Sequence, residues 1–183
     1  MSPTSSSLPP HGTQPNDDVR VPLAFSLNGE AVDTQVHPLD TLLELLRERL
    51  RHTGTKGACH EGECGSCTVL VDGVPMNSCL ILAPQVQGAE IVTVEGLADG
   101  EILSTVQQAF LDCGAVQCGY CTPGLLIAAQ SFLATCPNPT PEQVREGMEG
   151  NICRCTGYMK VVDAVVEAAK AMPTRAGGRH EHA

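Results

Sequence analysis

Three cysteines lie within nine residues, and their spacing restricts the local fold more than any other feature of the chain. Cys59, Cys64 and Cys67 follow the pattern C-x4-C-x2-C in the stretch ACHEGECGSCTVLVDG. A fourth cysteine, Cys79, follows at the far side of a predicted hairpin. Three glycines in and beside this loop allow tight turns and close backbone approach, where a Cβ atom would collide. We expect the loop to bring four thiols to one point.

This spacing is typical of plant-type [2Fe-2S] ferredoxins, in which four thiolates hold the cluster and backbone amides point at its sulfurs. The pattern therefore predicts an iron–sulfur site at Cys59, Cys64, Cys67 and Cys79. Four thiolates can also hold one zinc ion, although a glycine-rich gap of four residues is unusual for zinc. Zinc remains the alternative at this point.

A second set of four cysteines lies in the C-terminal half of the chain. Cys118 and Cys121 belong to QCGYC, and Cys153 and Cys155 belong to NICRC. Cys121 immediately precedes a predicted helix, where unpaired amides and the helix dipole favour a negatively charged cluster. Each pair lies on a connection between predicted helices, so both pairs can meet at one end of a bundle. This set predicts a second cluster, again with zinc as the alternative.

Five further residues are candidates for a role at these sites. Cys113 and Cys136 each end an apolar helical run, so we expect both to be buried in the core. His60 lies between two predicted ligands, but four cysteines already complete that site, and we expect a solvated loop histidine. Lys56 and Arg154 either offset cluster charge or are simply solvated.

The composition restricts the class of protein. Ten cysteines in 183 residues suggest either disulfides or bound metal. The N-terminus has neither the basic nor the apolar segment of a secretory signal, and no stretch approaches a membrane span, so we expect a cytoplasmic protein with reduced, metal-binding thiols. A net charge of -10 without a basic patch argues against a nucleic-acid partner.

Residues 20–97 carry the signals of a small α+β domain. Asn28-Gly29 and Asp72-Gly73 are typical turns of β-hairpins, and EIVTVEGL predicts one further strand. Between the hairpins, a helix is predicted to begin with a capping box at Thr41 and Glu44 and to end at Gly54.

Residues 98–172 are predicted to form a four-helix bundle. Helical spacing occurs in LSTVQQAFLDCG, TPGLLIAAQSFLATC, TPEQVREGMEG and MKVVDAVVEAAKAM. Thr122, followed by proline, is the predicted N-cap of the second of these helices. Residues 1–19 and 173–183 are predicted to be disordered tails.

The motifs CHEGECGSCTVLVDG with Cys79, QCGYCTPG and NICRCTGY, in this order, closely resemble the small iron–sulfur subunit of molybdenum hydroxylases of the xanthine oxidase family. The resemblance covers roughly residues 20–170. It implies an N-terminal β-grasp, ferredoxin-like domain followed by a four-helix-bundle domain, each with one [2Fe-2S] cluster.

The resemblance also implies partners and roles. A large subunit would carry the molybdopterin-type molybdenum cofactor and the substrate pocket, and a medium subunit would carry FAD, in a heterotrimer or a dimer of heterotrimers. Gln117, just before the C-G-x-C pair, would contact the pterin, and Cys155 would lie close to it. This chain would relay single electrons from molybdenum to FAD or another acceptor, and none of its residues would act on substrate.

Two other functions remain open from the residues alone. A free-standing two-cluster electron carrier would suit the acidic surface, but it gains little from a bundle that hides a second cluster. A zinc-stabilised interaction module would have no redox role. The sequence does not indicate which substrate a holoenzyme would act on.

Overall fold

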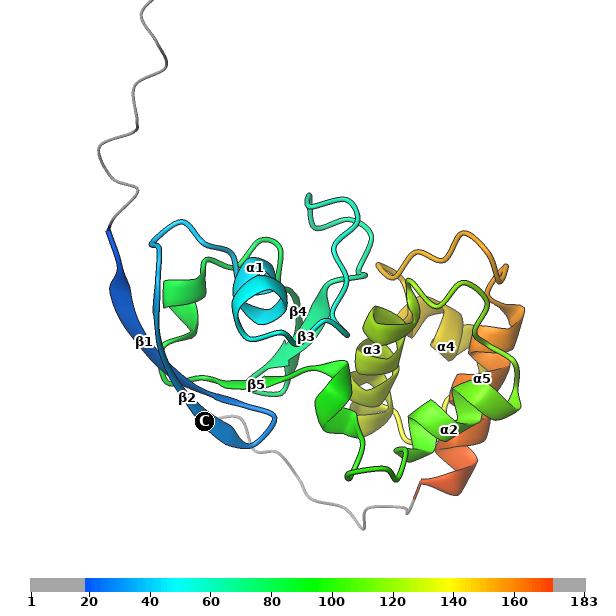
Figure 1. Cartoon of the computed structure of the whole chain (residues 1–183). Coiled ribbons are helices and arrows are strands. Elements are labelled where there is room, and N and C mark those ends of the chain that lie inside the picture. Colours follow the sequence, from blue (N-terminus) through cyan, green and yellow to red (C-terminus); the bar gives the residue numbers. More distant parts are fainter. Residues whose placement is uncertain (1–18, 173–183) are drawn as a thin grey trace, which may run out of the picture.

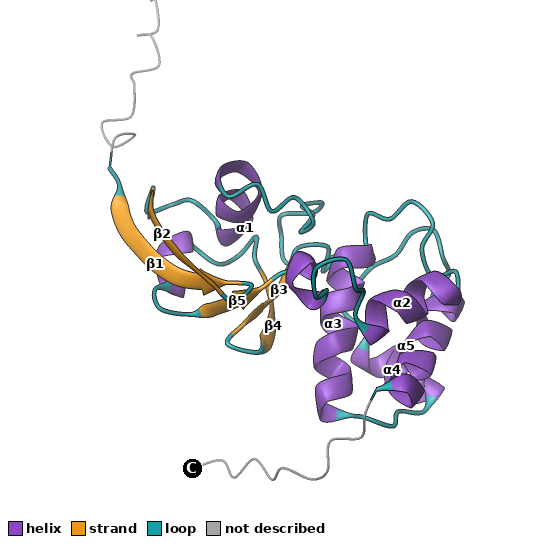
Figure 2. Cartoon of the chain, turned by 60° about the horizontal axis from the view of Figure 1, so that its bottom comes forward, coloured by secondary structure: helices purple, strands orange, loops and turns teal. Residues whose placement is uncertain are grey.

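A computed structural model describes residues 19–172, which form a mixed β-sheet with a group of helices beside it (Figure 1). Of the two predicted tails, residues 1–18 and 173–183 lie outside the described part of the chain. The sheet occupies the first half of the described sequence and the four longer helices occupy the second half (Figure 2). The predicted combination of sheet and helices is therefore confirmed.

Five strands form the sheet in the order β2-β1-β5-β3-β4. Both predicted hairpins are present, and their turn residues have the left-handed backbone that such turns require. Strand β5 runs parallel to β1 and antiparallel to β3, so it joins the two hairpins into one sheet. The strands are β1 (Val21–Leu27), β2 (Glu30–Val36), β3 (Thr68–Val71), β4 (Val74–Asn77) and β5 (Glu90–Val92).

The helix over the sheet ends earlier than predicted. The Thr41–Glu44 capping box begins α1 (Leu42–Glu44), which widens into a π-helical turn, η1 (Leu45–Arg49). Arg51 then adopts a left-handed backbone, so the predicted end at Gly54 is wrong. Gly54 has a different role: its N–H donates to the Glu95 carboxylate at 2.7 Å, and a Cβ there would collide with that side chain.

The predicted strand EIVTVEGL is shorter than expected, because a side chain of the first hairpin binds the backbone that would continue the strand. Strand β5 ends at Val92, and the next N–H, of Thr93, donates to the Asn28 side chain at 2.8 Å. Residues Val94–Leu97 then form the 3-10 turn η3. Another 3-10 turn, η2 (Ala83–Val86), precedes β5.

All four predicted helical segments of the second half are helices. Capping boxes at Ser104 and Thr140 begin α2 and α4. The N-cap of α3 is Cys121, one residue before the predicted Thr122. The helices are α2 (Thr105–Asp112), α3 (Thr122–Thr135), α4 (Pro141–Gly147) and α5 (Met159–Ala171).

Two apolar cores support the two halves. Leu42, Leu45 and Leu46 pack onto the sheet against residues such as Leu23 and Ile91. The helices share a separate core, which includes Phe110, Leu125, Leu126, Leu133 and Val161. Helix α3 lies between its own bundle and strands β3 and β4 (Figures 1 and 2). Within residues 19–172, no helix is long and apolar enough to span a bilayer.

Replacing Leu45 by Ala tests the assignment of the first core. Leu45 is fully buried, so Leu45→Ala should lower the free energy of unfolding by about 2–5 kcal/mol. Leu39 is 70% exposed, and Leu39→Ala is the matched control, with an expected change within about 0.5 kcal/mol. Anaerobic denaturant unfolding measures both changes. Equal losses in the two variants would contradict the packing described here.

Candidate metal centres

The first set of cysteines surrounds the start of the second hairpin. Cys59 and Cys64 lie on the loop that follows η1, Cys67 directly precedes β3, and Cys79 follows β4. Within the loop, Gly62 has a left-handed backbone. Cys67 and Cys79 are buried together with Leu43, which anchors this part of the loop beneath α1.

The four thiols of this set form two interacting pairs. Cys59 and Cys64 form one side-chain pair, and Cys67 and Cys79 form another. The charge of Cys64 also acts on Cys67, so the two pairs adjoin. The structure therefore brings together all four cysteines that the first motif predicted.

The protonation of these thiols differs with their surroundings. Hydrogen bonds from the backbone N–H groups of Glu61 and Cys64 lower the pKa of Cys59 to about 6. Burial raises the pKa of Cys67 to about 11. The Cys59 thiol therefore loses its proton more readily than the buried Cys67 thiol, and a bound positive metal ion would favour the thiolate form of Cys67.

The second set lies where two inter-helix connections meet. The Cys118 and Cys155 sulfur atoms are 3.6 Å apart, although one precedes α3 and the other precedes α5. Cys121 and Cys153 form the other side-chain pair, and the charge of Cys118 acts on Cys121. All four predicted cysteines are again together, at the end of the helical half next to the first loop (Figure 1).

Two hydrogen bonds point at one sulfur of this set. The Thr156 hydroxyl and backbone N–H lie 3.1 and 3.4 Å from Cys153 Sγ. Burial raises the pKa of Cys153, but these hydrogen bonds outweigh it and lower the pKa to about 7. Burial dominates at Cys121 and raises its pKa to about 12.

The thiols meet in pairs rather than around one point. Within residues 19–172, no group of three or more His, Cys, Asp or Glu side chains is arranged to hold a single metal ion. A [2Fe-2S] cluster has two irons, each of which takes two cysteine ligands. In such a cluster, each set would offer one thiol pair to each iron. The pairs would be Cys59–Cys64 and Cys67–Cys79 in the first set, and Cys118–Cys155 and Cys121–Cys153 in the second.

The remaining candidates divide into exposed and partly buried residues. Gln117 is exposed, as are the neighbouring Cys118 and Cys155. His60 is exposed and has a left-handed backbone, which agrees with the expected loop histidine. The Lys56 ammonium donates to the Thr53 carbonyl at 2.6 Å.

The prediction that Cys113 and Cys136 are buried is wrong, because both are only partly buried. Each is the C-cap residue of a helix. Cys113 still packs against the helical core.

Sequence reasoning missed three residues that support the sites. Thr156 hydrogen-bonds to a sulfur, and its position directly after CRC is a signal that could have identified it. The Tyr158 hydroxyl accepts the Cys153 N–H at 2.9 Å. The Asn77 side chain donates to the Gly62 carbonyl at 2.6 Å and so ties β4 to the cysteine loop. Tyr158 belongs to the same NICRCTGY motif, whereas the Asn77 contact depends on how β4 folds back onto the loop.

Comparison with known protein families matches both halves of the chain. Residues 25–104 match the model of the 2Fe-2S iron–sulfur cluster binding domain. Residues 93–166 match the model of the [2Fe-2S] binding domain. The two matches include the first and second cysteine sets, respectively.

The similarity to individual relatives extends over nearly the whole length of those proteins. The nicotinate dehydrogenase small FeS subunit of Eubacterium barkeri is 47% identical over 80% of this chain and 93% of its own. The xanthine dehydrogenase iron–sulfur-binding subunit of Escherichia coli O157:H7 is 45% identical over 85% of this chain and 98% of its own. A chain of the quinoline 2-oxidoreductase structure from Pseudomonas putida 86 superposes with a TM-score of 0.81 at 47% identity, over 83% of this chain and 95% of that one. The chain therefore belongs to the family of small [2Fe-2S] iron–sulfur subunits of the molybdenum hydroxylases, the xanthine oxidase family.

Proposed function

We propose that this chain is the electron-transfer subunit of a molybdenum-containing hydroxylase or dehydrogenase. The observation that carries the proposal is the convergence of two sets of four thiols on adjoining loops. When bound, a [2Fe-2S] cluster in each set supplies one-electron redox chemistry. The proposed ligands are Cys59, Cys64, Cys67 and Cys79 for one cluster and Cys118, Cys121, Cys153 and Cys155 for the other.

The two halves correspond, in this proposal, to a β-grasp ferredoxin-like domain over residues 20–97 and a four-helix-bundle domain over residues 98–172. The mixed sheet with α1 across it supports the first assignment, and four successive helices support the second. The order of the two family matches along the chain also supports it.

The exposed residues around the second cysteine set support a direction for electron transfer through the chain. Gln117, Cys118 and Cys155 are exposed, and so are two apolar side chains close to Cys155 in the sequence, Ile152 and Met159. Such a surface fits a partner that carries the molybdenum cofactor, with Gln117 and Cys155 at its pterin. Electrons would then leave through the first loop to FAD of a medium subunit or to another acceptor.

The chain itself contributes placement and tuning of the clusters. The Thr156 N–H donates to the Cys153 sulfur, and the Glu61 N–H donates to the Cys59 sulfur. The distance from nitrogen to sulfur is 3.4 Å in both contacts. Such hydrogen bonds stabilise the reduced form of a cluster, which is the more negative form, and so raise the midpoint potential of that cluster.

We place the complex in the cytoplasm as a heterotrimer or a dimer of heterotrimers, in keeping with relatives that are themselves subunits.

Metal analysis of the complex, purified natively from its source through this chain, tests the proposal. We expect about four irons and one molybdenum per copy of the chain. Four irons without molybdenum or a stable partner would instead identify a free-standing carrier, which the subunit names of the relatives do not favour. Zinc in place of iron would contradict both redox functions.

Replacing Cys118 by Ser tests the second ligand set. Cys118→Ser removes one sulfur of the Cys118–Cys155 pair, so it should remove about half of the iron, while the first cluster stays. Cys113→Ser is the matched control, because this cysteine lies outside both sets. Iron analysis and electron paramagnetic resonance (EPR) of the reduced protein measure the result. Full iron in Cys118→Ser would contradict the assignment.

Replacing Thr156 by Val tests the tuning of the second cluster. The loss of the hydroxyl hydrogen bond to Cys153 should lower the midpoint potential by roughly 20–60 mV, the equivalent of about 0.5–1.5 kcal/mol for one electron. Thr156→Ser keeps the hydroxyl and should keep the potential. EPR-monitored redox titration measures both variants. An unchanged potential in Thr156→Val would remove Thr156 from the tuning role.

A further inference from the structure

The middle of the first cysteine loop has little support of its own. Residues 58–63 belong to no helix or strand, and four of these six residues are exposed. Within the described part of the chain, only one hydrogen bond reaches them from outside residues 58–64. It comes from the Asn77 side chain at the end of β4, whose nitrogen donates to the Gly62 carbonyl at 2.6 Å. The loop that carries Cys59 therefore depends on Asn77 for its polar contact with the sheet.

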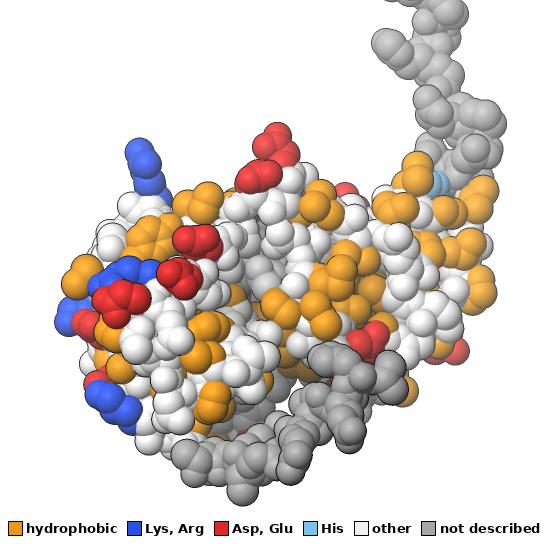
Figure 3. Space-filling view, turned by 180° about the vertical axis from the view of Figure 1, so that it is seen from behind, with side chains coloured by type: hydrophobic (Ala, Val, Ile, Leu, Met, Phe, Trp, Pro, Cys, Tyr) orange, Lys and Arg blue, Asp and Glu red, His pale blue; other side chains and the backbone are white. Residues whose placement is uncertain are grey.

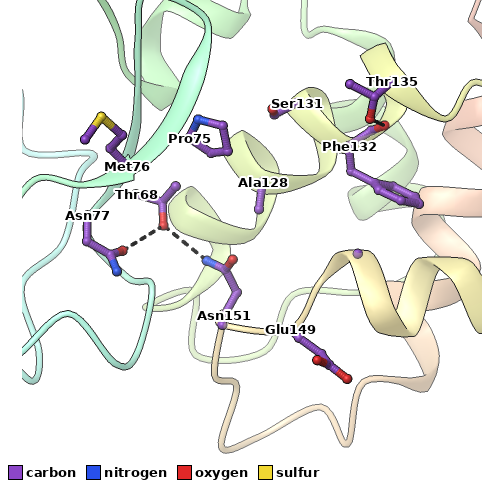
Figure 4. A pocket seen from close by; sticks show the side chains of 12 residues that line it. Thr68, Pro75, Met76, Asn77, Ala128, Ser131, Phe132, Thr135, Glu149 and Asn151 are labelled. Carbon is purple, nitrogen blue, oxygen red and sulfur yellow. Dashed lines mark hydrogen bonds between the residues drawn. The ribbon is translucent and has the colours of Figure 1, made fainter.

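The orientation of the Asn77 amide is fixed from both ends. The Gly62 carbonyl is only an acceptor, so the amide nitrogen must face it and the amide oxygen must face the other way. That oxygen lies 3.4 Å from the Thr68 hydroxyl and 3.9 Å from the Cys67 sulfur. Figure 4 shows Asn77 on one side of Thr68 and Asn151, of the helical half, on the other. The one side chain thus contacts both the loop and the start of the second hairpin.

Leu80 packs against the same point of the loop. Gly62 has φ of +80°, and a Cβ there would lie 2.4 Å from Leu80 Cδ1. Leu80 directly follows Cys79, and Asn77 lies two residues before it. The two residues that hold Gly62 therefore flank Cys79, a proposed ligand of the first cluster.

We infer that Asn77 is a positioning residue of the first cluster site. Its amide holds the thiol pair of the loop against the thiol pair of the second hairpin, which are Cys59–Cys64 and Cys67–Cys79 respectively. This inference rests on the proposed function, which assigns these four thiols to one cluster. Asn77 itself binds no metal. Loss of its hydrogen bond frees the middle of the loop, so the loop thiols separate more readily from the hairpin thiols and the cluster is more easily dismantled.

The test compares Asn77→Leu with Asn138→Leu in the natively purified complex. Leucine has nearly the shape of asparagine but cannot donate to the Gly62 carbonyl. Asn138 is an exposed asparagine outside both cysteine sets, so its variant is the matched control. Anaerobic release of iron to excess bathophenanthroline disulfonate measures how firmly each cluster is held. EPR of the dithionite-reduced complex reports the surroundings of each cluster, and Cys118→Ser identifies the signal of the first.

We expect Asn77→Leu to release the iron of the first cluster roughly tenfold faster, the equivalent of about one hydrogen bond to a buried group. The EPR signal of the same cluster should change, because the loop thiols take new positions relative to the hairpin. The second cluster of this variant should match the unmodified complex in both measurements. Both clusters of Asn138→Leu should do the same.

An unchanged release rate or an unchanged EPR signal of the first cluster in Asn77→Leu would overturn the inference. Equal acceleration at both clusters would also overturn it, because this result indicates general destabilisation rather than a local role. If Asn77→Leu does not fold, Asn77→Asp, with Asn138→Asp as its control, decides by the same measurements. Failure of the proposed function is distinguishable, because the unmodified complex would then lack four irons per chain.

Discussion

The carbonyl group of Gly65 is the point on which the arrangement of the two halves depends. It accepts hydrogen bonds from Asn151 of the helical half and from Thr68 of the sheet half. The first turn of α3 packs so close to it that residue 124 has no room for a Cβ. The two cores are otherwise separate, so this backbone contact sets the position of one cysteine loop relative to the other.

Rigid elements on each side support this contact. Cys67 is buried at the start of β3, and Cys121 is the N-cap of α3, so one thiol of each set is fixed by a regular element. The two halves differ in surface character on one face. On the face drawn in Figure 3, Lys and Arg side chains lie among Asp and Glu side chains over the helical half, and apolar side chains are prominent over the sheet half. Each cysteine set is thus anchored at one end by a regular element.

Much of the fold was predictable, because its signals are local. Turn pairs such as Asn28-Gly29, capping boxes and the cysteine spacings each depend on a few neighbouring residues. The errors arose where distant residues decide the outcome. The helix over the sheet ends in a π-helical turn at Arg49, and Thr93 leaves the sheet because Asn28 takes its N–H. Asn151 likewise gains its importance only from contacts with Gly65 and Thr68, more than eighty positions earlier.

The exposure of the second cysteine pair has a consequence for the order of assembly. Cys118 and Cys155 face water in the isolated chain, whereas Cys153 beside them is buried. This open side would give iron and sulfide access to the folded chain. In the proposed complex, a partner that covers this surface would close that access, so cluster insertion would have to come before subunit docking. The surface proposed to receive the partner would then also set the order of assembly.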